Sequence, residues 1–317
     1  MRNLKVAILG NHRHSFCTES ELAWTFERLG HTVFRFQEDQ DTTNRVMELC
    51  VANRVNLLVY IHTHGWESPG VVPFEQMVDA VKNSGTVTCG FHLDLYWGLN
   101  HADRRQDRIG THPFWKMDFV FTADGGNDAG FHARGVNHHW LPPAVAERGC
   151  YRGTYNPEYA VDVAFVGARS YHPEYHWRPY LIDWLEATYG DRFRRYCGDT
   201  KWGGFREQRL NDLYASVKVC VGDSCFAGAA PKYWSDRIPE TLGRGGFLIH
   251  PQVDGLDIPG LVTYQAGDMD RLKILIDHYV ESGIERQVLS DAAFEWVKNN
   301  ETYTNRVHRM LEIMGLE

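Results

Sequence analysis

The residues best suited to chemistry stand together in one stretch of the second half, PKYWSDRIPETLGRGG at 231–246. Ser235 or Asp236 can cap a helix that follows, and the amide groups at a helix start attract anions. Arg237 adds a fixed cation that suits a pyrophosphate. Glu240 lies one turn further on and can accept hydrogen bonds from two vicinal hydroxyls, as on a ribose. The alternative interpretation is an exposed, capped helix with an Arg–Glu pair at i, i+3.

A glycine stands directly after the strand expected at 161–166. Gly167 opens the sequence GARS, and a glycine at this point lets the backbone approach a ligand closely. No GxGxxG motif accompanies it, so a plain turn is the alternative.

Histidines and one aspartate follow the expected strands of the first half, where they could take a proton from an acceptor hydroxyl. They are His12, His14, His62, His64, His92 and Asp94. Asp94 is the first choice for a base, because Tyr96 and Trp97 beside it could stack on a sugar or a nucleobase. His64 and His12 are the next choices. The alternative for each is a hydrogen-bonded loop residue.

Metal chemistry has little support in the sequence. The HRH and HTH triplets place two histidines close together, but no HExxH or CxxC accompanies them. Asp268 and Asp270 form a DMD that precedes an amphipathic segment and is better interpreted as a helix N-cap. We therefore expect no metal ion.

The elements that position these residues alternate between strand and helix. The expected strands are the apolar runs at 4–9, 32–36, 57–61, 86–91, 118–122, 161–166, 193–197, 217–221, 246–250 and 261–264. The expected helices are 18–30, with a capping box of Thr18 and Glu21, then 74–83, 178–189, 206–216, 238–244, 270–281, 285–299 and 303–315. Residues 143–160 are rich in Pro and Gly and break the pattern.

Two successive βαβ series indicate an α/β fold of two Rossmann-like domains, 1–150 and 151–317. Ligands of such sheets bind at the carboxyl ends of the strands, which is where the candidate residues stand. We expect the two domains to face each other across a cleft.

The bulk composition narrows the setting. The net charge of −8 is unfavourable for a general nucleic-acid binder. The seven Cys, such as Cys89 and Cys220 in apolar runs, indicate reduced thiols and a cytoplasmic protein. We expect neither a signal peptide nor a membrane span.

The second half resembles the donor domain of GT-B glycosyltransferases, and in particular the CgeB-like, group 1-like transferases of bacteria and phages. The resemblance rests on DVAFVGARS (162–170), LNDLYASVKVCVGD (210–223), SDRIPETLGRGGFLIHP (235–251) and VKNNETYTNRVHRML (297–311), which occur in the family's order. The first half resembles the acceptor domain more loosely, through NHRHSF (11–16), HTHGWE (62–67) and FHLDLYWGL (91–99).

The resemblance implies roles for the donor-side residues. Arg237 would contact the donor diphosphate and Glu240, with Thr241 beside it, the donor ribose. Gly167 and Arg169 would line the phosphate side, and the segment 197–204, which includes Trp202, would lie near the nucleobase. Lys232 stands eight positions before Glu240, where many retaining GT-B enzymes carry an acidic residue. A cation there could stabilise the leaving diphosphate, and the stereochemical outcome stays open.

The expected activity is a metal-independent hexosyl- or pentosyltransferase whose donor is a nucleotide-diphosphate sugar, with no further cofactor. The acceptor could be a glycan or surface polymer, a small molecule, or a hydroxymethylated pyrimidine in phage DNA. A basic rim for DNA could come from Arg104, Arg105, Arg108, Arg134 and His138, although a solvated loop face explains these charges equally simply. A nucleotide-sugar epimerase and a non-catalytic nucleotide-binding protein are the alternatives, and the oligomeric state is unknown.

Overall fold

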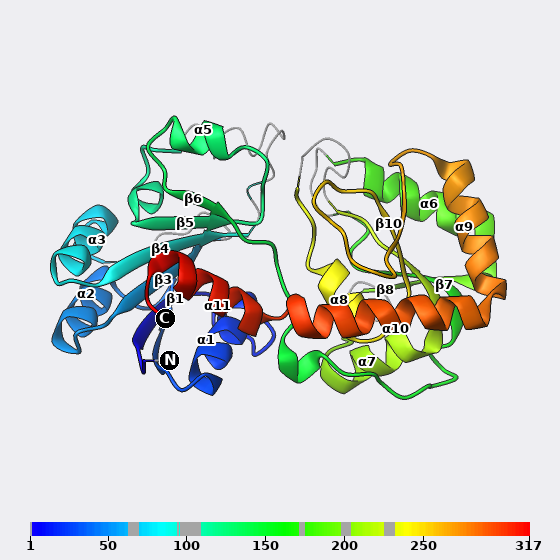
Figure 1. The fold of residues 1–317 in the computed structure, drawn as a ribbon, viewed down its shortest axis with the longest axis horizontal. Coiled ribbons are helices and arrows are strands. Elements are labelled where there is room, and N and C mark those ends of the chain that lie inside the picture. Colours follow the sequence, from blue (N-terminus) through cyan, green and yellow to red (C-terminus); the bar gives the residue numbers. More distant parts are fainter. Residues whose placement is uncertain are drawn as a thin grey trace. The chain divides into compact units, whose positions relative to one another are not determined.

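The protein is described by a computed structural model that covers residues 2–62, 70–93, 95, 109–170, 175–197, 204–224 and 232–317. The chain forms two compact units (Figure 1). The first comprises Met1–Pro142 with Tyr303–Glu317, and the second comprises Pro143–Thr302.

The first unit is built on a parallel sheet of order β2-β1-β3-β4-β5-β6 within the described residues. Its strands are β1 (Lys5–Gly10), β2 (Thr32–Gln37), β3 (Leu57–His62), β4 (Val87–His92), β5 (Phe119–Thr122) and β6 (His138–Trp140). The apolar runs of β1 and β3 are buried on both faces, which explains why they do not alternate with polar residues.

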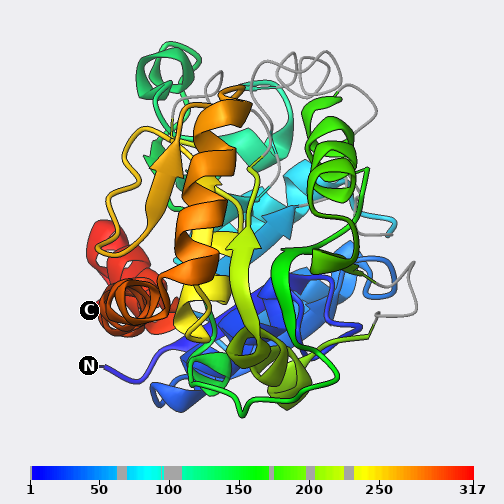
Figure 2. The ribbon, with the colours of Figure 1, turned by 90° about the vertical axis from the view of Figure 1, so that its right-hand side faces the viewer.

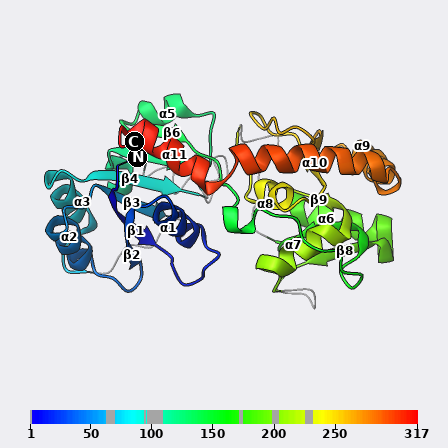
Figure 3. The ribbon, with the colours of Figure 1, turned by 60° about the horizontal axis from the view of Figure 1, so that its bottom comes forward.

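Helices cover both faces of this sheet. Ala7 and Leu9 of β1 point toward α2 (Thr43–Ala52) and α3 (Phe74–Asn83), with which they share one apolar core. Successive side chains of a strand point to opposite faces, so Val6 and Ile8 point the other way. Figure 3 shows α1 (Thr18–Arg28) and α11 (Tyr303–Met314) together on that side.

The second unit has a parallel sheet of order β11-β10-β9-β7-β8 in its described part. The strands are β7 (Val161–Val166), β8 (Phe193–Tyr196), β9 (Val217–Val221), β10 (Leu248–Pro251) and β11 (Val262–Tyr264). Two helices, α6 (Trp177–Tyr189) and α9 (Met269–Glu281), share a core with Val163, Phe165 and Val219 and lie in front of the strands in Figure 2.

The remaining helices of this unit are α7 (Glu207–Ser216), α8 (Arg237–Gly243) and α10 (Gly283–Asn300). Gly243 brings α8 close to α10, because a Cβ at this position would lie 3.0 Å from the Val297 side chain. The helix α8 runs from the carboxyl end of β9 back toward the start of β10, and it carries Arg237 at its first position.

The expected strands are all present, but several details of the sequence-based description are wrong or incomplete. The capping box of Thr18 and Glu21 does not form: Cys17 is the N-cap of α1, it makes no side-chain cap, and its carbonyl already accepts from Glu21 N. The sequence analysis missed α2, the five-residue helix α5 (Asp128–His132) and β6.

The last segment, residues 303–317, belongs to a different unit from the one expected. The division at residues 150 and 151 assigned 303–317 to the second domain, whereas α11 belongs to the first unit. The reason is an apolar face on α11, where Val307, Met310 and Leu311 are fully buried and the helix packs beside α1. No helix in the described ranges is both long and apolar enough to cross a bilayer.

We expect Met310→Ala to lower the free energy of unfolding by about 2–5 kcal/mol, because it leaves a cavity in this apolar contact. Urea denaturation followed by tryptophan fluorescence measures the change. Arg309→Ala is the matched control, since the Arg309 side chain is 58% exposed on the same helix. Equal midpoints for the two variants would contradict the packing role of α11.

Candidate functional site

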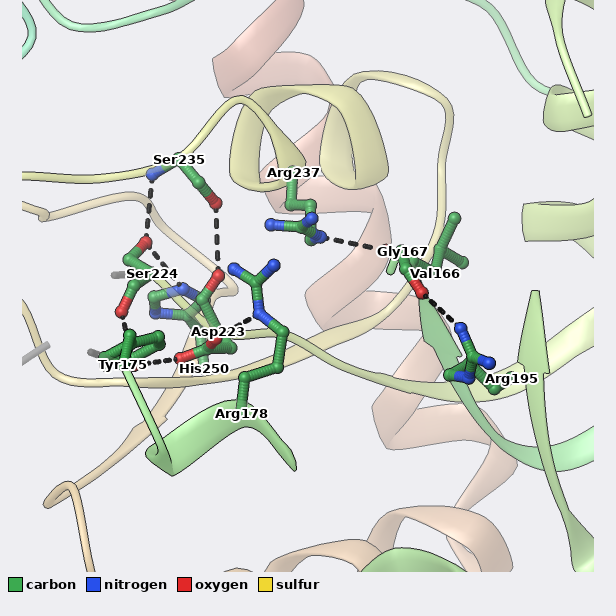
Figure 4. A network of polar contacts seen from close by, with 10 residues as sticks. All are labelled: Val166, Gly167, Tyr175, Arg178, Arg195, Asp223, Ser224, Ser235, Arg237 and His250. Carbon is green, nitrogen blue, oxygen red and sulfur yellow. Dashed lines mark hydrogen bonds and ion pairs between the residues drawn. The ribbon is translucent and has the colours of Figure 1, made fainter. Parts of the chain in front are cut away.

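The centre of the candidate site is the guanidinium of Arg237 at the carboxyl end of β7. Its Nε donates to the Val166 carbonyl at 2.9 Å, and its Cζ lies 5.7 Å from the centre of the Phe165 ring (Figure 4). Gly167 has φ +148°, and a Cβ on it would lie 2.7 Å from an Nη atom of Arg237. The side chain can lie here only because residue 167 is a glycine.

Arg237 has no carboxylate partner within the described part of the chain. Its hydrogen bond to the Val166 carbonyl uses Nε, and neither Nη atom is bonded to a described side chain or carbonyl. The residue is half-buried, where an unpaired cation is costly. Its two Nη groups form the fork that binds a phosphate or carboxylate with two parallel hydrogen bonds.

A second arginine beside it is fully neutralised. Arg178, near the start of α6, donates from Nε to Asp223 at 2.7 Å, and both side chains are almost fully buried. Tyr175 donates to the other oxygen of Asp223 at 2.6 Å. Arg178 and Arg237 lie over the same ring, Phe165. The pair therefore fixes the start of α6 against the end of β9 and leaves Arg237 as the cation available to a ligand.

A neutral hydrogen-bond chain ties the start of α8 to the same edge. Burial lowers the pKa of His250 to about 4, so the ring is uncharged at neutral pH. Its Nδ1 donates to the Pro251 carbonyl at 2.6 Å, which leaves Nε2 to accept from Ser224 Oγ at 3.1 Å. Ser224 Oγ in turn accepts from Ser235 N at 2.9 Å.

These hydrogen bonds show that the capping expected at the start of α8 is wrong. Ser235 Oγ donates to the Asp223 carbonyl at 3.2 Å, and Asp236 is the N-cap but makes no side-chain cap. The helix begins at Arg237 rather than near residue 238. Ser235 therefore fastens the preceding loop to β9.

Glu240 pairs with Arg244 instead of Arg237. Its Oε2 accepts from Arg244 Nε at 2.7 Å, and its side chain is 26% exposed. Oε1 makes no hydrogen bond within the described residues, so it is the oxygen that a ligand hydroxyl could reach. Thr241 is 2% exposed and packs against Gly246, which leaves it little surface for a ligand.

Three other cations flank this edge in different ways. Arg169 pairs with Asp183 of α6 at 2.6 Å. Arg195 of β8 donates to the Gly167 carbonyl at 3.3 Å and so lies beside the glycine turn. Lys232 is exposed and has φ +58°, a backbone conformation that L residues rarely adopt. The ligand roles of Arg169 and Lys232 stay predictions.

In the first unit, His12 lies just beyond the end of β1. Its Nε2 lies 3.2 Å from the Ile8 carbonyl, which can only accept, so in the neutral ring Nε2 carries the proton and Nδ1 is the acceptor. Burial lowers the pKa of His12, which favours this neutral form at pH 7. Such a ring has the protonation state of a general base.

Two buried carboxyl groups lie at the same edge, and the sequence analysis missed both. Glu38 follows β2 and is 1% exposed, and Glu19 of α1 is 5% exposed. Gly10, at the end of β1, makes room for Glu19, since a Cβ there would lie 2.6 Å from the Glu19 chain. Burial, and then the charge of Glu19, raises the pKa of Glu38 to about 7.

Three other histidines of the first unit differ in burial and contacts. His92 is buried against Phe114 and Trp115. His138 does not belong to a basic rim: it is 2% exposed, bonded to Asp128 and Thr122, and burial lowers its pKa to about 4. His14 is exposed and stacks on Phe16.

Part of the predicted site lies outside the described residues. Asp94, His64, Trp202, Tyr96, Trp97, Arg104, Arg105 and Arg108 belong to it, as does the side chain of His62. Among the residues that are described, no group of three or more His, Cys, Asp or Glu side chains is arranged to hold a metal ion.

The sequence analysis also missed Arg178, Asp223 and His250. The available signal was Asp223, an acidic residue only two positions after the end of β9. Its partner, Arg178, lies on α6, 45 residues away along the chain.

Glu38→Gln tests the buried carboxyl pair through the pH dependence of stability. Between the ordinary pKa of 4.5 and about 7 the folded protein binds more protons at Glu38 than the unfolded chain does. Stability therefore falls as pH rises through that window, and above it the full cost remains. We expect Glu38→Gln to be more stable than the parent at pH 8, by up to about 3 kcal/mol, with little difference at pH 4.

Urea denaturation at the two pH values measures this difference. Glu48→Gln, at an exposed position of α2, is the control and should be neutral at both. A gain that is the same at pH 4 and pH 8 would contradict the raised pKa.

No family model matches the chain, and no curated protein matches it by sequence. Solved structures do match it in fold. Sucrose-phosphate synthase from Thermosynechococcus elongatus has a TM-score of 0.65 at 10% identity, covering 99% of this chain and 98% of that one. An alpha-glucosyltransferase in complex with UDP has a TM-score of 0.68 at 10% identity, covering 99% and 100%. HepE from Anabaena in complex with UDP and glucose has a TM-score of 0.62 at 10% identity, covering 99% and 100%. The chain therefore has the GT-B fold, with two parallel-sheet α/β units.

Proposed function

We propose that the protein is a metal-independent glycosyltransferase that moves a sugar from a nucleotide-diphosphate sugar to an acceptor hydroxyl. The observation that carries this proposal is the half-buried Arg237, whose Nη groups have no described partner, at the carboxyl edge of a Rossmann-like sheet. An anion with two or more oxygens, such as a diphosphate, satisfies both groups at once. The GT-B fold supports the glycosyltransferase proposal, because structures with that fold hold UDP and UDP-glucose.

The donor would bind to the second unit, and the first unit would serve the acceptor. Arg237 takes the diphosphate over the Gly167 turn, and Oε1 of Glu240 accepts from the ribose hydroxyls. Arg244 orients the Glu240 carboxylate through Oε2. Trp202, in the segment 197–204, is proposed for the nucleobase side.

In the transfer step the acceptor oxygen bonds to the anomeric carbon while the bond from that carbon to the diphosphate oxygen breaks. The acceptor proton goes to a base of the first unit, for which Asp94, His64 and His12 are the candidates. The electron pair of the broken bond stays on the diphosphate, whose growing charge Arg237 and Lys232 stabilise.

The family, the cellular location and the acceptor are also part of the proposal. We infer a CgeB-like transferase that acts in the cytoplasm, a setting with which the buried thiols of Cys89 and Cys220 are compatible. The acceptor is a hydroxyl of a glycan, of a small molecule or of a hydroxymethylated pyrimidine in DNA. The last class is worth testing because one alpha-glucosyltransferase of the same fold is solved with UDP and DNA containing a HMU base.

The decisive experiment is incubation with UDP-glucose and other nucleotide sugars, followed by chromatography of the nucleotide and sugar products. A glycosyltransferase releases the nucleoside diphosphate, slowly to water and faster with the right acceptor. An epimerase gives a new nucleotide sugar without release. Binding without any turnover across the donor panel would favour a non-catalytic nucleotide-binding protein.

Arg237→Gln should weaken the binding of both UDP and inorganic pyrophosphate by about 10- to 100-fold, because hydrogen bonds to a charged group contribute about 1.5–3 kcal/mol. Isothermal titration measures both affinities. Arg271→Gln, an exposed position of α9, is the matched control and should bind as the parent does. Unchanged pyrophosphate affinity in Arg237→Gln would remove the diphosphate role.

Glu240→Gln should separate the ribose from the diphosphate. We expect about tenfold weaker UDP binding, or about 1.4 kcal/mol, because a neutral amide accepts the ribose hydroxyls less strongly. Pyrophosphate affinity should stay within about twofold of the parent value, since pyrophosphate has no ribose. Equal losses for the two ligands would argue against the ribose assignment.

A further inference from the structure

A cavity of about 400 Å³ lies at the opposite ends of the strands from Arg237, within the second unit. Val217 and Lys218 at the start of β9 and Phe247 just before β10 line it, together with residues of α10 and of the loop before β7. Four cationic side chains contribute to the lining: Arg152, Lys218, Arg244 and Arg286. None of the residues that line it is acidic.

Three of these cations have carboxylate partners that stand outside the lining. The pairs are Arg152–Asp291 at 2.5 Å, Lys218–Asp162 at 2.8 Å and Arg244–Glu240 at 2.7 Å. The carboxylates hold the cations in place, while the cavity surface itself presents only positive charge. Asp162 is further shared with Arg192 at 2.6 Å, so its negative charge is divided between two cations.

Arg286 is the fourth cation of the lining, and it differs from the other three in its partners. It donates to the carbonyls of Tyr279 and Val280 at the end of α9, and no carboxylate of the described chain pairs with it. Its partial burial lowers its pKa, and the charge of Asp162 offsets part of this effect. An anion in the cavity would pair with this cation.

The size and the remaining lining indicate what kind of anion fits. A volume of about 400 Å³ is within the range of small-molecule sites and larger than a bare phosphate needs. Tyr155, 62% exposed, offers an aromatic ring, and Ser290 and Gln287 offer polar groups. An organic group with hydroxyls suits such a surface.

We propose that this cavity is a second ligand site, which binds a small phosphorylated molecule with its phosphate at Arg286, Arg152 and Lys218 and its organic part against Tyr155. The site is separate from the donor edge, because Arg237 does not line it and the two lie at opposite ends of the same strands. The inference does not depend on the glycosyltransferase proposal.

The test compares inorganic phosphate, ribose 5-phosphate and ribose, each at constant ionic strength with chloride as the reference anion. Thermal unfolding gives the affinities, because a ligand that binds only the folded state raises the midpoint. We expect both phosphates to raise it more than chloride does, and ribose 5-phosphate to bind more tightly than phosphate. Ribose alone should have no effect.

Variants locate the binding. Arg286→Gln should weaken the binding of ribose 5-phosphate at least about tenfold, about 1.4 kcal/mol, and Arg286→Lys should restore part of it. Arg271→Gln and Arg237→Gln should leave most of it intact. Should Arg286→Gln not fold, Lys218→Gln, whose side chain is 46% exposed, serves in its place.

Two results would overturn the proposal. One is a phosphate effect on the parent protein no larger than that of chloride. The other is binding that Arg237→Gln abolishes and Arg286→Gln leaves intact, which would place the phosphate at the donor edge and leave the glycosyltransferase proposal standing.

Discussion

One cation, Arg237, which has no carboxylate partner among the described residues, organises the carboxyl edge of the second unit. Arg237 is held by the Val166 carbonyl and the Phe165 ring, and both contacts fix its position without neutralising its charge. The contrast with Arg178 is informative, because that arginine lies over the same ring but is matched by Asp223. A structure that needed only stability could have paired both. Within the described residues, the two arginines over Phe165 therefore differ in that Arg178 has a carboxylate partner and Arg237 has none.

The surrounding hydrogen bonds make that charge a fixed one. His250, Ser224 and Ser235 form a chain in which each donor has an acceptor, and the neutral ring of His250 adds no competing cation. A buried polar network that is fully satisfied restricts movement. Because the chain ends at Ser235, two residues before Arg237, it fixes the backbone from which the guanidinium extends. A ligand then meets a preorganised cation, which lowers the cost of ordering it on binding.

The sequence predicted what is local and missed what converges from a distance. The strands follow from continuous apolar runs, and Asp268 caps α9 as its position before that helix indicates. Arg237 and Gly167, which lie against each other in the structure, could be singled out because each stands at a local signal, a helix start and a strand end. Arg178 and Asp223 have no such signal, since only the folded sheet brings them together. The expected cap at Thr18 failed because α1 starts one residue earlier, with Cys17 as its N-cap. The expected cap at Ser235 failed because its hydroxyl binds the Asp223 carbonyl, two residues after β9.

The position of α11 in the first unit is another feature that the sequence alone does not predict. The helix itself was correctly expected at 303–315, but an amphipathic helix does not specify which sheet it covers. The answer depends on an exposed apolar surface elsewhere, here beside α1 in the first unit. Sequence adjacency to the second unit was therefore a poor guide to the last fifteen or so residues.

Arg244 connects the two regions of the second unit that present positive charge. It lines the cavity at the amino ends of the strands and holds Oε2 of Glu240, which stands on the helix that begins at the other edge. It also bonds Asn211 and the Gly149 carbonyl, so its guanidinium has few free positions. An anion that drew Arg244 toward the cavity would loosen its hold on Glu240. By thermodynamic linkage, a ligand at Glu240 would then change the affinity of the cavity by the same factor. A single side chain shared between the two proposed sites would thus be enough to couple them, without any change in the fold.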